Sequence, residues 1–180
     1  MVVTSSNEVR IGLTNCNRLY EKIYSDKKLL ETKISEAKFD EFAFFNFIVT
    51  SWHLYNDWLN ADKLNRPALV HKKKKRTPAL MLEVMNIARD ITNGSKHLKL
   101  DQTNMKKKVV AEVHEPEIRD WYSYFIAGPQ YAISTESSYY SVSDLLFLIT
   151  DYFEWLFDDS IQPENFPEKL HNHLKYCKIK

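Results

Sequence analysis

The sequence predicts a mainly α-helical protein, a four- or five-helix bundle with a small antiparallel β insert before the penultimate helix. Over four long segments and one short one, apolar residues recur at steps of three and four, which is the period of a helix with one buried face. Between 104 and 140 the pattern changes to short, loosely alternating runs rich in β-branched and aromatic residues. With 180 residues and 44% apolar content, the chain is long enough to bury one core. We therefore expect a single helical domain over 1–180, with 104–140 as the β-rich insert.

The composition narrows the class of function. A formal net charge of +1 argues against capture of nucleic acid by bulk electrostatics. Two cysteines, Cys16 and Cys177, are too few for a disulfide framework or a thiolate metal site. The N-terminus lacks the basic and apolar regions of a signal peptide, and no run reaches the roughly 18 apolar residues of a membrane span. These features predict a soluble, cytoplasmic protein with reduced thiols and no membrane association.

Two helices are expected in the first third of the chain. The first runs from Asn7 to about Ile34 with one apolar face. Ser35 is a candidate cap for the second, which covers roughly 36–61. This second helix is apolar nearly all round, so we expect it to be central in the domain.

A line of polar residues interrupts the second helix. Its members follow steps of four, three, four and three and so share one side of the helix. Inside an apolar helix such a line must meet polar partners or water. The line consists of Asn46, Thr50, His53, Asp57 and Asn60.

The connector at 62–78 carries the basic run at 71–76. The run shows no helical period, and such runs are usually solvated, so we expect a surface loop. The alternative is a patch that contacts phosphate groups.

The third helix, about 80–98, carries a second polar line. At about 100° per residue, Asn86, Asp90, Asn93 and His97 fall in one stripe, about 120° from the apolar face. We call this stripe the polar seam and expect it to face the polar line of the second helix. Asn93-Gly94 is also a good helix C-terminus, which would put Lys96 and His97 in the following turn. Both alternatives remain open at this point.

The second half of the chain predicts short strands at 106–115, 121–127 and 131–134. Ser141 or Ser143 is expected to cap a helix that ends near Phe157, and a short helix follows at 168–176. His171 and His173 lie two residues apart on that last helix, so they face different ways and are expected on the surface.

Three kinds of site are compatible with the two polar lines. In the first, His97 or His53 performs acid–base chemistry, with Asp90 or Asp57 orienting the imidazole. In the second, the lines form a structural network that fixes the packing of the helices. In the third, His53, Asp57, Asp90 and His97 bind a metal, although the spacings typical of metal-binding helices are absent. With three glycines and no glycine-rich phosphate loop, we expect no cofactor, and we assign no metal ligand.

The segment from Asp90 to His97, preceded by His53-Leu-Tyr-Asn-Asp57-Trp, resembles motifs of uncharacterised bacterial helical proteins and, more distantly, of the HEPN superfamily. The resemblance covers 36–98 and the pattern of the last helices. HEPN domains are helical and usually dimeric, and many are metal-independent ribonucleases of toxin–antitoxin and anti-phage systems. Their motif places four to six residues between an Arg and a His, whereas seven separate Arg89 from His97 here.

The resemblance implies roles for the seam. His97 would be the general base on a ribose 2′-hydroxyl, Arg89 or Lys96 would stabilise charge on the phosphate, and Asp90 or Asn93 would orient the base. On a straight helix Arg89 points away from the stripe of His97, so Lys96 is the better-placed cation if the chain turns at Gly94. We therefore expect a candidate metal-independent endoribonuclease acting on RNA, as a homodimer or with a partner protein of a defence system. The alternatives are a non-catalytic interaction subunit whose seam is structural, and a metal-dependent phosphohydrolase.

Overall fold

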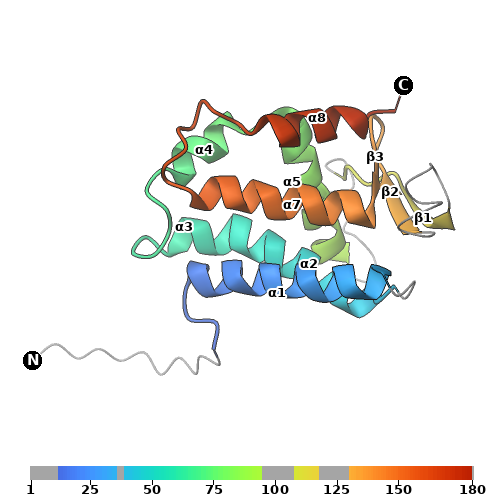
Figure 1. Cartoon of the computed structure of the whole chain (residues 1–180), viewed down its shortest axis with the longest axis horizontal. Coiled ribbons are helices and arrows are strands. Elements are labelled where there is room, and N and C mark those ends of the chain that lie inside the picture. The colour runs from blue at the N-terminus through green and yellow to red at the C-terminus, as the bar shows by residue number, and fades with distance from the viewer. Residues whose placement is uncertain (1–11, 36–38, 95–107, 118–129, 180) are drawn as a thin grey trace, which may run out of the picture.

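A computed structural model of the chain describes residues 12–35, 39–94, 108–117 and 130–179 (Figure 1). The fold is mainly α-helical with a small three-stranded antiparallel sheet, as the sequence predicts. The elements in chain order are α1 (Cys16–Ser35), α2 (Glu41–His53), η1 (Leu54–Trp58), α3 (Leu59–Ala61), α4 (Val70–Arg76), α5 (Ala79–Gly94), β1 (Glu112–Glu117), β2 (Gln130–Ser134), β3 (Tyr139–Ser141), α7 (Val142–Phe157) and α8 (Glu168–Tyr176). None of the described helices is both long and apolar enough to cross a membrane.

The central helix is α7, and the prediction that the second helix is central is wrong. In Figure 1, α7 lies between α1 below it and α8 above it. Of its 16 residues, 12 are buried. In α2 three residues are buried, and the ring of Phe42 is 83% exposed. Apolar residues all round a helix thus do not ensure burial on all sides, because only the sides that meet another element are covered.

The first helix begins later than predicted, at Cys16 rather than Asn7. Gly12 has a φ of 74°, which places a turn just before the helix. The Asn15 side chain accepts a hydrogen bond from the Arg18 backbone N–H at 3.0 Å, which is the geometry of a helix cap. Asp62 then accepts the Cys16 backbone N–H at 3.0 Å. The predicted residues before 12 lie outside the described part.

Asp40, and not Ser35, caps the second helix. Its carboxylate accepts the Ala43 backbone N–H at 2.9 Å, whereas Ser35 is the last residue of α1. The helix continues as predicted to Ala61, but it changes to a π-helical turn, η1, directly after His53. The π turn inserts extra backbone into the middle of the polar line.

The basic run is helical, so the prediction of a loop is wrong. Asp159 accepts the backbone N–H groups of Ala68 and Leu69 at 2.9 and 3.0 Å and thereby holds the two residues that lead into α4. Lys73 is fully buried, and its ammonium donates to the carbonyl oxygens of Trp155 and Asp158 at 2.5 and 2.6 Å. Lysine is a good helix former, and these two partners compensate for its burial at the C-terminal end of α7.

The sheet has the order β1–β2–β3, with both pairs antiparallel. The predicted strand at 131–134 is confirmed within β2. The strand predicted at 106–115 is shifted to β1, which contains Pro116 next to an irregular register, as an edge strand allows. The strand predicted at 121–127 lies outside the described residues. The sequence did not indicate β3, because its three residues lead directly into the cap of α7.

Glu83 of α5 joins the sheet to the helices. Its carboxylate accepts hydrogen bonds from Thr135, Ser137 and Tyr140 at 2.9, 3.0 and 3.2 Å. These hydroxyls surround the connection between β2 and β3. The short sheet therefore gains from α5 a support that three strands alone would lack.

The last two helices match their predictions. Ser141 caps α7 in a capping box with Asp144, and α8 covers the predicted residues.

Candidate functional site

Five of the seven predicted site residues lie in the part of the chain that the structure describes, and two do not. His53 and Asp57 lie on α2 and η1, and Arg89, Asp90 and Asn93 lie on α5. Lys96 and His97 are outside the described residues, so their predicted roles stay predictions. Whether the helix continues beyond Gly94 is untested for the same reason.

His53 and Asp57 form a surface pair. The Nδ1 of His53 lies 2.6 Å from the Oδ2 of Asp57, and the two side chains are 34% and 50% exposed. Asn56 donates to the other carboxylate oxygen at 2.7 Å. A carboxylate accepts, so Nδ1 of His53 donates this hydrogen bond and Nε2 is the ring nitrogen that points away from Asp57. The pair has the orientation that the sequence predicts for an imidazole in acid–base chemistry.

The polar line also meets cations from neighbouring helices. Lys22 of α1 donates to Thr50 at 3.0 Å and forms an ion pair with Asp26. Lys74 of α4 donates to the Tyr55 carbonyl oxygen at 2.8 Å and to Asn60 at 3.3 Å. The line therefore meets polar partners, as predicted, but they come from α1 and α4. The prediction that the polar seam is the partner is wrong for Asn86 and Asp90, whose side chains bond with Arg89 and with the backbone of residues 109 and 110.

Asp90 holds the segment that leads into the sheet. Its Oδ2 accepts the backbone N–H groups of Val109 and Val110 at 2.6 and 3.3 Å. Its Oδ1 accepts from Arg89 Nε and Nη2 at 3.0 and 2.9 Å, and its side chain is 9% exposed. The Arg89 guanidinium also donates to Asn86 at 3.0 Å. These bonds are those of a structural anchor, and they turn Arg89 toward the seam rather than away from it.

The metal alternative gains no support from the described residues. His53, Asp57 and Asp90 do not form a group of three converging ligands in that part of the chain. A different group does converge, made of Asp144, His173 and Cys177.

His171 is exposed, as expected, whereas His173 is only partly exposed and contacts α7. Its Nε2 donates to Asp144 Oδ1 at 2.7 Å, and its side chain is 29% exposed. Burial raises the pKa of Asp144, but the hydrogen bonds from His173 and Ser141 outweigh burial and leave that pKa below its usual value. Sequence reasoning missed this contact because the partners are 29 residues apart. The spacing of His173 and Cys177, four residues on one helix face, was the available signal.

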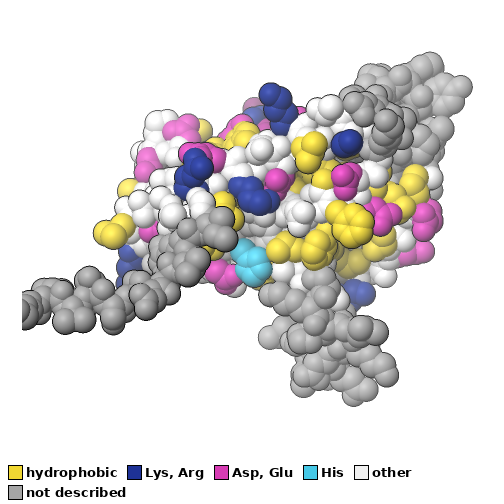
Figure 2. Space-filling model, turned by 90° about the horizontal axis from the view of Figure 1, so that it is seen from below, with side chains coloured by type: hydrophobic (Ala, Val, Ile, Leu, Met, Phe, Trp, Pro, Cys, Tyr) yellow, Lys and Arg dark blue, Asp and Glu magenta, His cyan; other side chains and the backbone are white. Residues whose placement is uncertain are grey.

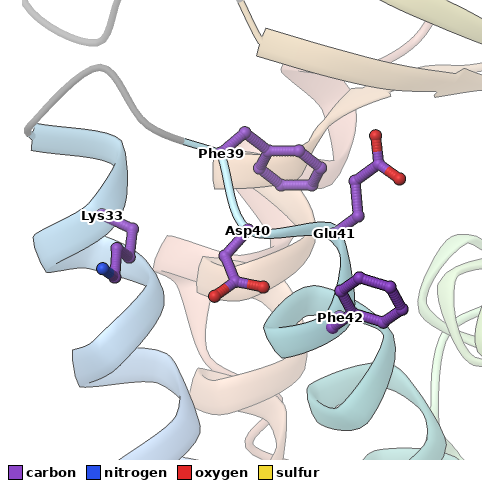
Figure 3. Close-up of a pocket in the computed structure, with 5 residues that line it drawn as sticks. All are labelled: Lys33, Phe39, Asp40, Glu41 and Phe42. Carbon is purple, nitrogen blue, oxygen red and sulfur yellow. The ribbon is translucent and has the colours of Figure 1, made fainter.

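The face formed by α1 and α2 exposes apolar side chains. Figure 2, which views the molecule from below, shows hydrophobic side chains gathered there beside a histidine. A hollow of about 350 Å³ opens at the corner between α1 and α2 (Figure 3). Its lining includes Asp40, which caps α2, and Glu41, which accepts from the Tyr131 hydroxyl at 3.0 Å. The carboxylate of Asp40 thus stabilises the start of α2, and the carboxylate of Glu41 connects α2 to strand β2.

Comparison with known proteins adds no family to this description, since the chain matches no family model, no curated protein and no solved structure.

Proposed function

We propose that the protein is a metal-independent endoribonuclease in which His53 and Asp57 are the described acid–base pair. The observation that carries this proposal is the 2.6 Å contact between Nδ1 of His53 and Asp57 on an accessible face. In the proposed reaction, Nε2 of His53 takes the proton of a ribose 2′-hydroxyl, and the 2′-oxygen attacks the adjacent phosphorus. The bond from phosphorus to the 5′-oxygen of the next nucleotide breaks, His97 donates a proton to that oxygen, and a 2′,3′-cyclic phosphate remains.

Asp57 supports this role electrostatically. Its carboxylate fixes the tautomer of His53 and stabilises the imidazolium that forms when Nε2 takes a proton. The π turn that contains Asp57 adds to the argument, because single π turns within α-helices are frequent at functional sites.

The cation that such a reaction needs is close in the fold. Lys22 contacts Thr50, which precedes His53 by one helical turn. An ammonium in that position stabilises negative charge that builds on the phosphate oxygens. In this proposal Lys96 adds a second cation, as the resemblance to the HEPN superfamily implies. His97, to which the resemblance gives the role of general base, acts here as the general acid, because His53 already takes the 2′-hydroxyl proton.

The same resemblance supports the proposed context. We place the protein in the cytoplasm, as a homodimer or bound to a partner protein of a defence or toxin–antitoxin system. RNA is the proposed substrate.

The test is cleavage of RNA in the presence of EDTA by the wild type and by His53→Ala and His97→Ala. We expect each substitution to slow cleavage at least about 100-fold, as removal of a general base or a general acid does. His171→Ala, which removes an exposed histidine of α8, is the matched control and should cleave as the wild type does. Circular dichroism checks that each variant is folded. Absence of cleavage by the wild type, or normal cleavage by folded His53→Ala, would overturn the proposal.

A second candidate is a non-catalytic interaction subunit whose polar seam is structural. The anchoring of Val109 and Val110 by Asp90 favours it, because this carboxylate serves the fold rather than an imidazole. In that case the wild type and all variants leave RNA intact. Substitution of Asp90 then lowers only the free energy of unfolding.

A further inference from the structure

Asp144, His173 and Cys177 bring three different metal-binding groups together at one end of the molecule. One ligand atom from each lies within 4.8 Å of the other two. Asp144 belongs to the first turn of α7, and His173 and Cys177 belong to the last turn of α8 and the residue after it. The two ends of the sequence segment 144–177 thus meet at this point, away from the polar line of α2.

We propose that these three side chains form a binding site for a zinc-like divalent cation, with a fourth position open to water. An imidazole, a thiolate and a carboxylate are the ligand types that Zn²⁺ takes in proteins. Three protein ligands leave one tetrahedral position for a solvent molecule.

The distances bracket those of a zinc site, since one pair is shorter and the remaining pairs reach at most 4.8 Å. Ligand atoms about 2.0–2.3 Å from a tetrahedral zinc ion lie roughly 3.4–3.7 Å from one another. The His173 Nε2 to Asp144 Oδ1 distance of 2.7 Å therefore has to open by less than about 1 Å. Rotation of the half-buried His173 side chain achieves this, and the metal then replaces the hydrogen bond.

The surrounding bonds hold the ligands in place. The backbone N–H and the hydroxyl of Ser141 donate to Asp144 Oδ2 at 2.8 and 2.7 Å, so that the other oxygen faces His173. The ring of His173 packs against that of Phe147, with centroids 4.7 Å apart. The Cys177 carbonyl oxygen accepts the backbone N–H of Tyr139 at 2.8 Å, which ties this end of α8 to β3. Such supporting contacts orient metal ligands and raise their affinity.

The burial of Cys177 argues against a role as a catalytic nucleophile. Cys177 is 0% exposed, so its sulfur is out of reach of a macromolecular substrate. A single ion needs a much smaller opening, and the 29% exposed side chain of His173 provides the entry side. The site therefore fits an ion better than it fits covalent catalysis.

The test uses the full chain, stripped with EDTA and dialysed, and titrated with Zn²⁺ by calorimetry and with Co²⁺ by absorption spectroscopy. We expect about one equivalent of Zn²⁺ to bind, and the Co²⁺ form to show thiolate-to-metal charge-transfer absorption and tetrahedral d–d bands. Cys177→Ser should abolish the charge-transfer absorption, and His173→Gln should weaken binding at least about tenfold. Zn²⁺ should raise the melting temperature of the wild type, because it binds the folded state.

Matched controls come from the same chain. Cys16→Ser removes the other buried thiol, and His171→Gln removes a histidine of the same helix that lies outside the cluster. Both should bind as the wild type does. Failure of the wild type to bind Zn²⁺, or unchanged binding by Cys177→Ser, would overturn the site. A Cys177→Ala variant, folded by circular dichroism, replaces Cys177→Ser if the serine variant does not fold.

Discussion

The ammonium of Lys73 lies in the interior, where it donates to the last carbonyl oxygens of α7 and lies 5.4 Å from the centre of the Trp155 ring. Burial lowers the pKa of Lys73, although the carboxylates of Asp159 and Asp158 oppose that shift. The side chain thus belongs to the core and joins α4 to α7.

We expect Lys73→Met to lower the free energy of unfolding by about 2–4 kcal/mol, because two charge-assisted hydrogen bonds are lost and the carbonyl oxygens stay buried. Lys72→Met, at the exposed neighbouring position, should change it by less than about 0.5 kcal/mol. Urea denaturation of the two variants measures both values. Equal effects would show that Lys73 has no special role.

His71 gives the stability of the protein a pH dependence. Burial, followed by the charges of Arg66, Lys74 and Lys75, lowers its pKa below the usual 6.5. The unfolded chain therefore binds a proton at this histidine more readily than the folded protein does. The contribution of His71 is complete above pH 6.5 and is lost as the pH falls through the lowered pKa.

His71→Gln should accordingly make the free energy of unfolding fall less steeply between neutral and mildly acidic pH. Urea denaturation at a series of pH values for the wild type and the variant measures the two slopes. Identical slopes would contradict the assignment.

At the scale of elements, Asp90 fixes the way in which the chain enters the sheet after α5. Its two backbone acceptor bonds hold residues 109 and 110, directly before β1. A carboxylate that accepts backbone N–H groups at 9% exposure contributes more than a surface ion pair does.

Asp90→Ala should therefore cost about 2–3 kcal/mol of unfolding free energy and speed hydrogen exchange at the amides of Val109 and Val110. Asp57→Ala is the control, since that carboxylate is 50% exposed and its loss should change stability by less than about 1 kcal/mol. Unchanged exchange at both amides in Asp90→Ala would show that the segment is held by other contacts.

At the scale of the whole molecule, α7 organises the core, and α1, α4, α5, α8 and the sheet pack around it. Two places on the surface of this bundle carry the side chains of the proposed sites. The polar line of α2 and η1 carries His53 and Asp57, and the junction of α7 with α8 carries the cluster of Asp144, His173 and Cys177.

The sequence predicted the features that depend on residues close to one another in the chain, such as helix positions and helix caps. The apolar period located the long helices, and the expected cap at Ser141 or Ser143 located the start of α7, which Ser141 caps. It did not reveal contacts between distant residues. Lys73 contacts Trp155, which is 82 residues away in the sequence. A run of six basic residues therefore did not indicate that one of its lysines is buried. The pairing of His53 with Asp57 was accessible to sequence reasoning because the two residues are four apart on one helix.

We propose that His53 acts on the 2′-hydroxyl of RNA without a metal, and the end group of the cleavage product reports on this step. The wild type is incubated in EDTA with an RNA oligonucleotide and with the same sequence lacking 2′-hydroxyls, and the products are identified by mass spectrometry. If His53 acts in this way, the RNA fragments end in a 2′,3′-cyclic phosphate and the deoxy oligonucleotide stays intact. Cleavage of both strands to simple phosphate ends, or of neither strand, would contradict this proposal.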